Sequence, residues 1–274
     1  MAGAGVALPQ DSLIAATNPA GMVHVGERID VGVSLFSPMR EYEASSASAA
    51  TGFFTVGPNT DPTFANTGTV AAQSKESENE AFLVPQFGWN KMLTPDSSIG
   101  VSVYGNGGMN TQYDGGFGTF NFTFFGFPPG PGSAPSFPGT FGGGQPGTPG
   151  GSTAGVDLSQ LFVAPTYSRK FAGGKASWGV SAILAYQLFE ARGLGAFAPF
   201  STNPNKLTDN NHDSSFGAGA RLGIMAELSP QLTVGASYQT PIWMDEFGEY
   251  EGLFAEQGGF DIPQNATLGL AWRP

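Results

Sequence analysis

Residues 216–228 read FGAGARLGIMAEL, and every second residue of this stretch is apolar. The apolar side holds Phe216, Ala218, Ala220, Leu222, Ile224, Ala226 and Leu228. The opposite side holds glycines, Met225 and the charged residues Arg221 and Glu227. A period of two is typical of a β-strand with one apolar face. This stretch therefore predicts a strand whose second face is lined by small and polar groups.

The same period recurs along the chain and predicts about eight strands, all in one antiparallel sheet. The other segments with this period are residues 28–35, 82–93, 99–104, 158–170, 178–188, 232–238 and 266–272. Short turns at Thr94, Ala172 and Ser229 alternate with long loops at residues 44–80, 106–155, 193–213 and 245–263. The stretch 106–155 is so rich in Gly, Pro and Phe that we expect a loop without regular elements.

Composition limits the classes of protein that fit these strands. The chain has 274 residues, a net charge of -11 and only 12% charged residues, whereas soluble domains have roughly 25%. An acidic chain does not neutralise phosphates, so nucleic acid is not an expected partner. There is no cysteine, and no apolar run reaches the roughly 18 residues of a membrane helix. If the chain spans a bilayer, it does so as a closed β-barrel. We also find no signal-peptide pattern.

Three observations favour an antiparallel transmembrane β-barrel over a soluble sandwich. Short turns on one side and long loops on the other are typical of outer-membrane barrels. The polar strand faces are poor in Lys and Glu, as expected of a lumen and not of a solvated sheet. Trp89, Trp178 and Trp272 share the apolar phase and the short-turn end, where an aromatic girdle would lie. The alternative is that these tryptophans are scattered core residues.

The first 22 residues, MAGAGVALPQDSLIAATNPAGM, differ from the rest of the chain. Asp11 is a good N-cap for a short helical turn, and this turn must end at Asn18, because the residue before a proline avoids the α region. The segment is either an ordinary connector or a plug inside the barrel. Its Gly/Ala-rich, apolar composition fits the second interpretation.

These residues resemble the FadL/TodX family of outer-membrane transporters for long-chain fatty acids and other hydrophobic compounds. The resemblance rests on GAGVALPQDSLIAATNPAGM, FGWNKMLTPDSSIGVSVYGNGGMNT, DLSQLFVAPTYSRKF and GLFAEQGGFDIPQNATLGLAW. It implies a 14-stranded barrel with a hatch, here the C-terminal part of one in residues 1–26, and a partial barrel in residues 27–274. Asn18, Pro19 and Ala20 match the Asn-Pro-Ala signature of the hatch. The implied activity is passive uptake through the Gram-negative outer membrane, with hatch movement and exit through a lateral gap in the wall.

The chain departs from the family in having about eight predicted strands and no terminal aromatic strand. We therefore expect a fragment truncated at both ends, although a self-contained eight-stranded barrel is possible. A structural or adhesive barrel without transport is the alternative function. The implied partners are a hydrophobic ligand, membrane lipid and lipopolysaccharide, and a monomer is expected.

The resemblance points to the loops 193–213 and 245–263 for ligand capture. The candidate residues are Arg192, Leu194, Phe197, Phe200, Lys206, Leu253 and Phe254. The apolar members would form a groove, and Arg192 or Lys206 would face a carboxylate headgroup. Taken singly, each could equally be a loop anchor or a solvated charge. We expect no enzyme activity, cofactor or metal site, because neither His24 nor His212 lies in a catalytic or metal-ligand motif.

Overall fold

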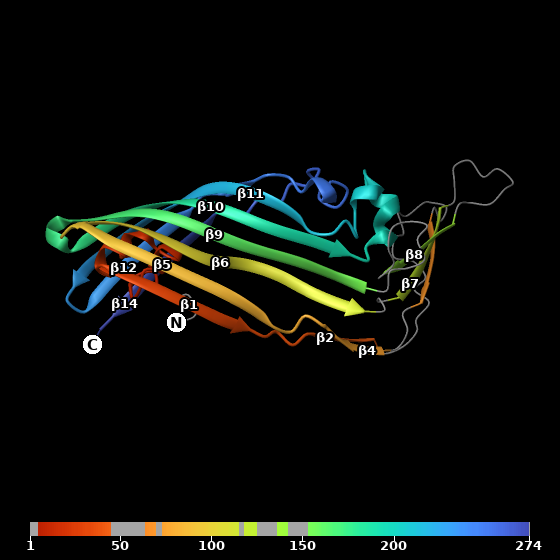
Figure 1. The fold of residues 1–274 in the computed structure, drawn as a ribbon, viewed down its shortest axis with the longest axis horizontal. Helices are drawn as coiled ribbons and strands as arrows, with labels where there is room; N and C mark the ends of the chain where they lie inside the picture. The colour runs from red at the N-terminus through yellow and green to blue at the C-terminus, as the bar shows by residue number, and fades with distance from the viewer. Residues whose placement is uncertain are drawn as a thin grey trace, which may run out of the picture.

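The computed structural model describes residues 5–44, 64–69, 73–114, 118–124, 136–141 and 153–273. A nine-stranded antiparallel sheet curls into a half-barrel, as the alternating sequence predicts (Figure 1). Its strands in order are β1 (Arg28–Phe36), β5 (Phe82–Thr94), β6 (Ser97–Asp114), β9 (Thr153–Phe171), β10 (Ala176–Arg192), β11 (Asp213–Ser229), β12 (Leu232–Gln239) and β14 (Asn265–Trp272). The short strand β13 (Trp243–Met244) also pairs with β11.

The half-barrel has a turn end and a loop end. Short turns join β5 to β6 and β11 to β12, and the 3-10 turn η3 (Ala172–Gly174) joins β9 to β10 at the same end. At the loop end lie two small sheets, the pair β2 (Glu41–Ala44) and β4 (Gln73–Glu76) and the set β3 (Phe64–Thr69), β7 (Gly118–Phe124) and β8 (Ser136–Phe141) (Figure 1). The loops there hold the 3-10 turns η4 (Gly195–Phe200), η5 (Pro204–Lys206) and η6 (Gly248–Tyr250).

The prediction that residues 106–155 lack regular structure is wrong at both ends and in β7 and β8. β6 continues to Asp114 and β9 begins at Thr153, and these extensions pair with one another over their whole length. A register shift between Gly105 and Gly107 absorbs the irregular Gly-Asn-Gly-Gly stretch. Glycine weakens a strand, but a full ladder of backbone hydrogen bonds outweighs that local preference.

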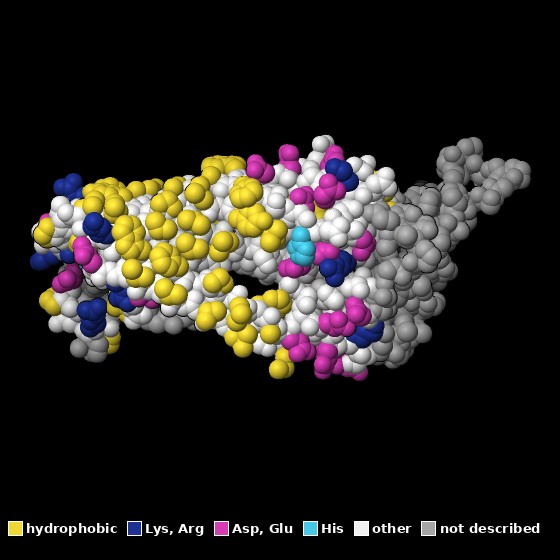
Figure 2. Space-filling view, in the orientation of Figure 1, with side chains coloured by type: hydrophobic (Ala, Val, Ile, Leu, Met, Phe, Trp, Pro, Cys, Tyr) yellow, Lys and Arg dark blue, Asp and Glu magenta, His cyan; other side chains and the backbone are white. Residues whose placement is uncertain are grey.

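The two faces of the sheet follow the predicted alternation. The apolar phase points outward: Val31 and Leu268, on the two end strands, are 79% and 85% exposed, and Figure 2 shows an apolar band over the turn-end half. The inward phase carries buried polar groups, namely Ser98, Ser102, Thr166, Ser168, Ser177, Ser181, Gln187, Arg221 and Gln239. This inside-out distribution is that of a barrel with a polar lumen and an apolar outer wall.

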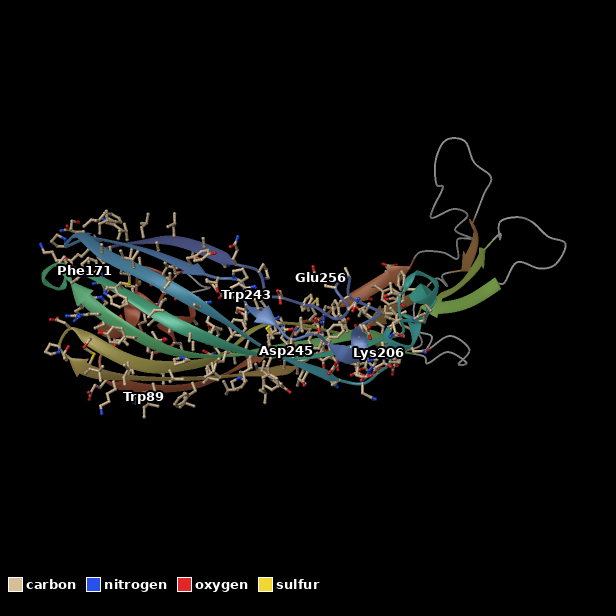
Figure 3. The ribbon with its side chains drawn as sticks, turned by 90° about the horizontal axis from the view of Figure 1, so that it is seen from above. Trp89, Phe171, Lys206, Trp243, Asp245 and Glu256 are labelled. Atoms are coloured by element: carbon tan, nitrogen blue, oxygen red, sulfur yellow. The ribbon has the colours of Figure 1, made fainter. Side chains whose placement is uncertain are left out.

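The aromatic residues at the turn end also follow the prediction. Trp178 and Trp272 are 41% and 67% exposed on the outer surface, and Trp178 packs against Tyr167. Figure 3 places Trp89 and Phe171 at this end, whereas Trp243 lies nearer the loop end.

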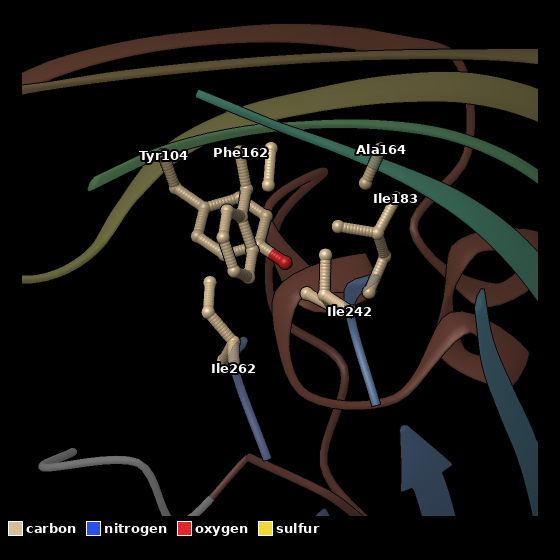
Figure 4. Packing of buried hydrophobic residues seen from close by; sticks show 7 residues of the cluster. Tyr104, Phe162, Ala164, Ile183, Ile242 and Ile262 are labelled. Carbon is tan, nitrogen blue, oxygen red and sulfur yellow. The ribbon is translucent and has the colours of Figure 1, made fainter. Parts of the chain in front are cut away.

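Three apolar clusters succeed one another inside the half-barrel. The first belongs to the N-terminal segment and contains Ile14, Ala15 and Met22. The second, here called the middle cluster, contains Tyr104, Phe162, Ala164, Ile183, Ala185, Ile242 and Ile262 (Figure 4). The third, the loop cluster, contains Leu158, Phe189, Ala191, Phe247 and Tyr250. Together they fill the lumen from the turn end to the loop end.

Candidate functional site

The N-terminal segment, residues 5–26, packs against the inner face of the wall. It forms the predicted turn as η1 (Ile14–Ala16), and a second 3-10 turn, η2 (Pro19–His24), begins directly after Asn18. The proline fits at the first position of η2, where its missing N–H has no helical partner. The η2 turn contacts β9, β10 and β11. The segment is therefore part of the interior and not a surface connector.

Asn18 ties this segment to itself and to the wall. Its Oδ1 accepts from the Ala20 N–H at 3.1 Å, which caps η2. Its Nδ2 donates to the carbonyl of Val6 at 2.7 Å and to that of Ile224 on β11 at 3.2 Å. The side chain is fully buried, so each of these bonds replaces a lost bond to water. Only an amide supplies an acceptor and two donors in this geometry.

Ala20 is the next anchor point on the segment. Its carbonyl accepts from Ser177 Oγ on β10 at 2.9 Å and from Ser168 Oγ on β9 at 3.2 Å. His24 Nε2 lies 2.9 Å from the same Ser177 Oγ. These serines are two of the small polar groups on the inward phase, so the polar lumen serves as a binding surface for the segment's backbone.

Charged and amide side chains of the wall hold the remainder of the segment. Asp30 on β1 accepts from both the N–H and the Oγ of Ser12, at 2.9 and 2.6 Å. Asn90 on β5 donates to the carbonyls of Met22 and Gly26, at 2.9 and 2.7 Å. Asp30 and Asn90 belong to no recognisable motif, and their only signal in the sequence is a polar residue type on the inward phase of a strand.

Arg221 on β11 is the only one of the inward wall residues named above that carries a positive charge. It donates to the carbonyls of Ala15 and Ala16, to Tyr104 Oη and to Gln239 Oε1. The guanidinium is buried, and no carboxylate pairs with it within the described residues. The inward position predicted from the alternation is correct, and its contacts show that Arg221 binds the N-terminal segment.

Five glycines of the wall form what we call the glycine seat. They are Gly88 on β5, Gly100 on β6, Gly179 on β10, Gly223 on β11 and Gly235 on β12. A Cβ at each of them would collide with an atom of the N-terminal segment, in turn Ser12, Met22, Pro19, Asn18 and Val6. The absence of a side chain at these points therefore lets the segment approach the wall.

The wall opens between β5 and β6. Their pairing begins at the turn end and stops at Phe87 and Val103, so that residues 82–86 of β5 pair with β1 alone. Beyond this point β6 pairs with β9 alone, and residues 105–109 of β6 are exposed. Figure 2 shows a hole in the apolar surface at this level.

A cavity of about 360 Å³ lies beside the N-terminal segment. Ala16 and Thr17 of the segment line it together with Arg221, Gln239 and Asn106, and further lining comes from Ile262 and its neighbours in the last loop. Asn106 belongs to the irregular part of β6, next to the opening. The cavity therefore connects the segment, the β6 irregularity and the loop before β14.

The two cations predicted to face a carboxylate headgroup already have carboxylate partners. Arg192 Nε lies 2.8 Å from Glu190 Oε1, and Lys206 Nζ lies 3.8 Å from Glu251 Oε2 and donates to the Gly248 carbonyl at 2.8 Å. His212 lies between Asp157 and Glu190, at 3.0 and 3.2 Å.

The structure brings three of the five apolar candidates together. Leu194, Leu253 and Phe254 pack against the loop cluster, and the Phe254 ring lies 5.1 Å from the ring of Phe189. Phe197 is 40% exposed in η4 and does not belong to the cluster. Phe200 lies at the end of η4, and its side chain is outside the described part of the chain.

Tyr250 fastens the two loops to each other. Its Oη donates to the Asn211 carbonyl at 2.7 Å and accepts from the Ala191 N–H at 3.1 Å. Burial raises the pKa of its phenol to about 12.

Neither a metal site nor a membrane helix is found among the described residues. No group of three or more His, Asp or Glu side chains is placed to hold a metal ion there. No helix in the same ranges is long and apolar enough to cross a membrane.

Comparison with solved structures identifies the type of fold. Two crystal structures of the Pseudomonas putida toluene transporter TodX are similar, each at 15% identity, with TM-scores of 0.55 and 0.56 and with 94% and 99% of this chain covered. A TodX deltaS2S3 mutant, described as a monoaromatic hydrocarbon channel, matches at 14% identity with a TM-score of 0.56 over 98% of this chain. The chain has a FadL/TodX-type fold. This confirms the fold that the sequence resemblance implies.

The match covers 61%, 66% and 65% of those three solved chains, so this chain spans less than two thirds of their length. No family model and no curated protein matches the sequence.

Proposed function

We propose that this chain acts in the outer membrane of Gram-negative bacteria as a passive uptake channel for hydrophobic small molecules such as long-chain fatty acids. Residues 5–26 serve as its hatch. One observation carries this proposal: the N-terminal segment is bound inside a half-barrel whose wall opens directly beside it between β5 and β6. A segment held in the lumen by hydrogen bonds, without a disulfide crosslink to the wall, can move aside when those bonds exchange for others.

We propose a ligand route that runs from the two loops, past the middle cluster and the cavity, to the gap in the wall. A ligand is captured by the apolar side chains of the loops 193–213 and 245–263 and passes the middle cluster to the cavity beside Arg221. Displacement of residues 14–20 then opens the way to the gap between β5 and β6, where the ligand enters the lipid. No energy source is needed, because the hydrophobic effect drives an apolar molecule from water into the bilayer.

The outer surface supports the membrane location. Its apolar band covers the turn-end half, while charged groups occupy the two ends (Figure 2). Burying such a band in lipid removes a large apolar area from water. The expected surroundings are outer-membrane lipid and lipopolysaccharide, with a single protomer as the working unit.

Uptake by reconstituted protein tests the proposal. Liposomes with the protein should take up a labelled long-chain fatty acid or an apolar dye faster than protein-free liposomes. Replacing residues 196–206 by a short Gly/Ser linker should lower the initial rate, because capture is lost while the anchors Arg192 and Thr208 remain. Equal rates in all three preparations, with the variant folded by circular dichroism, would favour a structural barrel without transport.

A further inference from the structure

We propose that the lumen binds uncharged hydrophobic compounds that carry one hydrogen-bonding group, a hydroxyl or a carbonyl, and that Gln187 is the partner of this group. The proposal rests on the uptake function above and narrows its class of ligand. It assigns a binding site between the middle cluster and the loop cluster.

Gln187 is a fully buried amide on the inward face of β10. Both its Nε2 and its Oε1 lack a hydrogen-bond partner among the residues that the structure describes. Buried amides in native proteins are almost always paired, because an unpaired one costs the full desolvation of the group. An amide kept in this position is therefore suited to bind a polar group that arrives with a ligand.

The neighbours of Gln187 along β10 are apolar. On the inward phase Ile183 and Ala185 precede it and belong to the middle cluster, and Phe189 and Ala191 follow it and belong to the loop cluster. A ligand bound here would bury an apolar body against aliphatic and aromatic side chains and would satisfy one polar group. Few polar groups in a mostly apolar site are typical of small-molecule binding.

A band of polar side chains connects Gln187 with the cavity. Its register partners are Gln160 on β9 and Ser215 on β11. Gln160 Oε1 accepts from Asn106 Nδ2 at 3.0 Å, and Asn106 lines the 360 Å³ cavity. Ser215 Oγ donates to the Asp245 carbonyl at 2.5 Å, at the start of the last long loop. The band thus reaches from the cavity and the wall opening, past Gln187, to the start of the last long loop.

The charges at the loop end disfavour a carboxylate as the polar group, compared with an uncharged one. Residues 190–213 and 245–261 contain nine Asp and Glu against two cations, and both cations are paired with glutamates. Figure 3 shows Asp245, Glu256 and Lys206 in the loop-end half of the molecule. An acidic entrance repels anions and lowers their encounter rate. Within the described wall, Arg221 is engaged by four neutral oxygen acceptors, so a carboxylate would have to compete with all of them.

The test compares three labelled compounds of one chain length, namely an n-alkane, its primary alcohol and its carboxylate. Equilibrium binding to the purified protein and initial uptake into proteoliposomes are measured for each, with protein-free vesicles as background. The key variant is Gln187→Met, which keeps the length of the side chain and removes the amide. The matched control is Gln231→Met in the turn between β11 and β12, an exposed amide outside the lumen whose Oε1 accepts from Ser229 Oγ at 3.4 Å.

The wild-type protein should bind the alcohol about three- to tenfold more tightly than the alkane, the range that one neutral hydrogen bond provides. It should bind the carboxylate more weakly than the alcohol. Gln187→Met should bring the alcohol-to-alkane affinity ratio to one or below, because the hydroxyl is then buried without a partner, while Gln231→Met leaves the ratio unchanged. An unchanged ratio in the folded Gln187→Met protein, or a preference for the carboxylate, would overturn the inference. If proteoliposomes show no uptake but binding still shows a Gln187-dependent preference for the alcohol over the alkane, the proposed transport function is wrong and the proposed binding site at Gln187 is supported.

Discussion

Single residues decide how the N-terminal segment fits the lumen. Gly223 is the clearest case, because a methyl group there would overlap Asn18 Oδ1 and press on Pro19 Cδ at 2.8 Å. The Asn-Pro-Ala sequence and the facing glycine therefore form one unit, although Gly223 follows Pro19 by 204 positions in the chain.

We predict that Gly223→Ala destabilises the packed segment by about 1 to 3 kcal/mol, the usual cost of an extra methyl group in a filled space. Chemical unfolding in lipid and hydrogen exchange of residues 14–20 measure this. Gly32→Ala on β1 is the matched control, since its added Cβ would approach other atoms no closer than 4.0 Å. Equal effects of the two substitutions would show that the seat does not depend on glycine.

Arg221→Met should loosen the same segment from the other side. The carbonyls of Ala15 and Ala16 lose a charged donor, and one such bond contributes about 1.5 to 3 kcal/mol. Amide exchange of residues 14–20 should accelerate about tenfold or more, whereas the turn-end substitution Arg273→Met should leave it unchanged. Unaltered exchange in Arg221→Met would mean that the other contacts of the segment, such as those of Asn18, Asp30 and Ser177, hold it without Arg221.

At the scale of elements, the two loops that we propose for capture pack together. Phe247, Tyr250, Phe254 and Phe260 of the second loop form a continuous chain of aromatic contacts with Phe189 on β10, and Tyr250 Oη donates to the Asn211 carbonyl of the first loop. The apolar candidates that the sequence offered for a groove thus include anchors of these packed loops. Any capture surface must lie on their exposed side or form when they open.

Tyr250 should make loop stability depend on alkaline pH. Its pKa is raised to about 12, so the folded state favours the neutral phenol. The stability that the neutral phenol contributes is fully present below pH 10, which is the pKa of tyrosine in the unfolded chain. It is lost as the pH rises from about 10 to about 12. The unfolding free energies of wild type and Tyr250→Phe should therefore converge over this window. A constant difference between them would contradict the assignment.

The sequence predicts the strands well because their period of two directly encodes a sheet with unlike faces. All eight predicted strands are present, and the inward placement of Arg221 is correct. The extensions of β6 and β9 could not be foreseen, because glycine-rich segments gain their order from pairing with each other. The ion pairs of Arg192 and Lys206 could not be predicted either, because Glu190 and Glu251 come close to them only through the local backbone conformation at the end of β10 and in the last loop.

For the molecule as a whole, the gap between β5 and β6 is the exit that we propose for the ligand through the side of the wall. A crosslink across the gap tests this route. A Cβ built on Gly105 would lie 3.0 Å from Val84 Cγ1, and the native chain contains no cysteine. The double variant Val84→Cys/Gly105→Cys should therefore form a disulfide under oxidation.

The oxidised double variant should take up hydrophobic compounds at least several-fold more slowly than the reduced one, and reductant should restore the rate. Each single-cysteine variant serves as a control that cannot crosslink. Undiminished uptake by fully oxidised protein would place the exit elsewhere.

The contacts between the N-terminal segment and the wall also imply an order in which the parts of the chain fold. Its bonds to the wall join residues far apart in sequence, with separations of 206 for Asn18 to Ile224 and for Arg221 to Ala15. Contacts of such span form late in folding, because the entropy of closing the intervening chain must be offset first. Residues 5–26 precede every strand of the wall in the sequence, yet they reach their final position last. The half-barrel therefore forms first, and residues 5–26 enter its lumen only after β11 has joined the sheet.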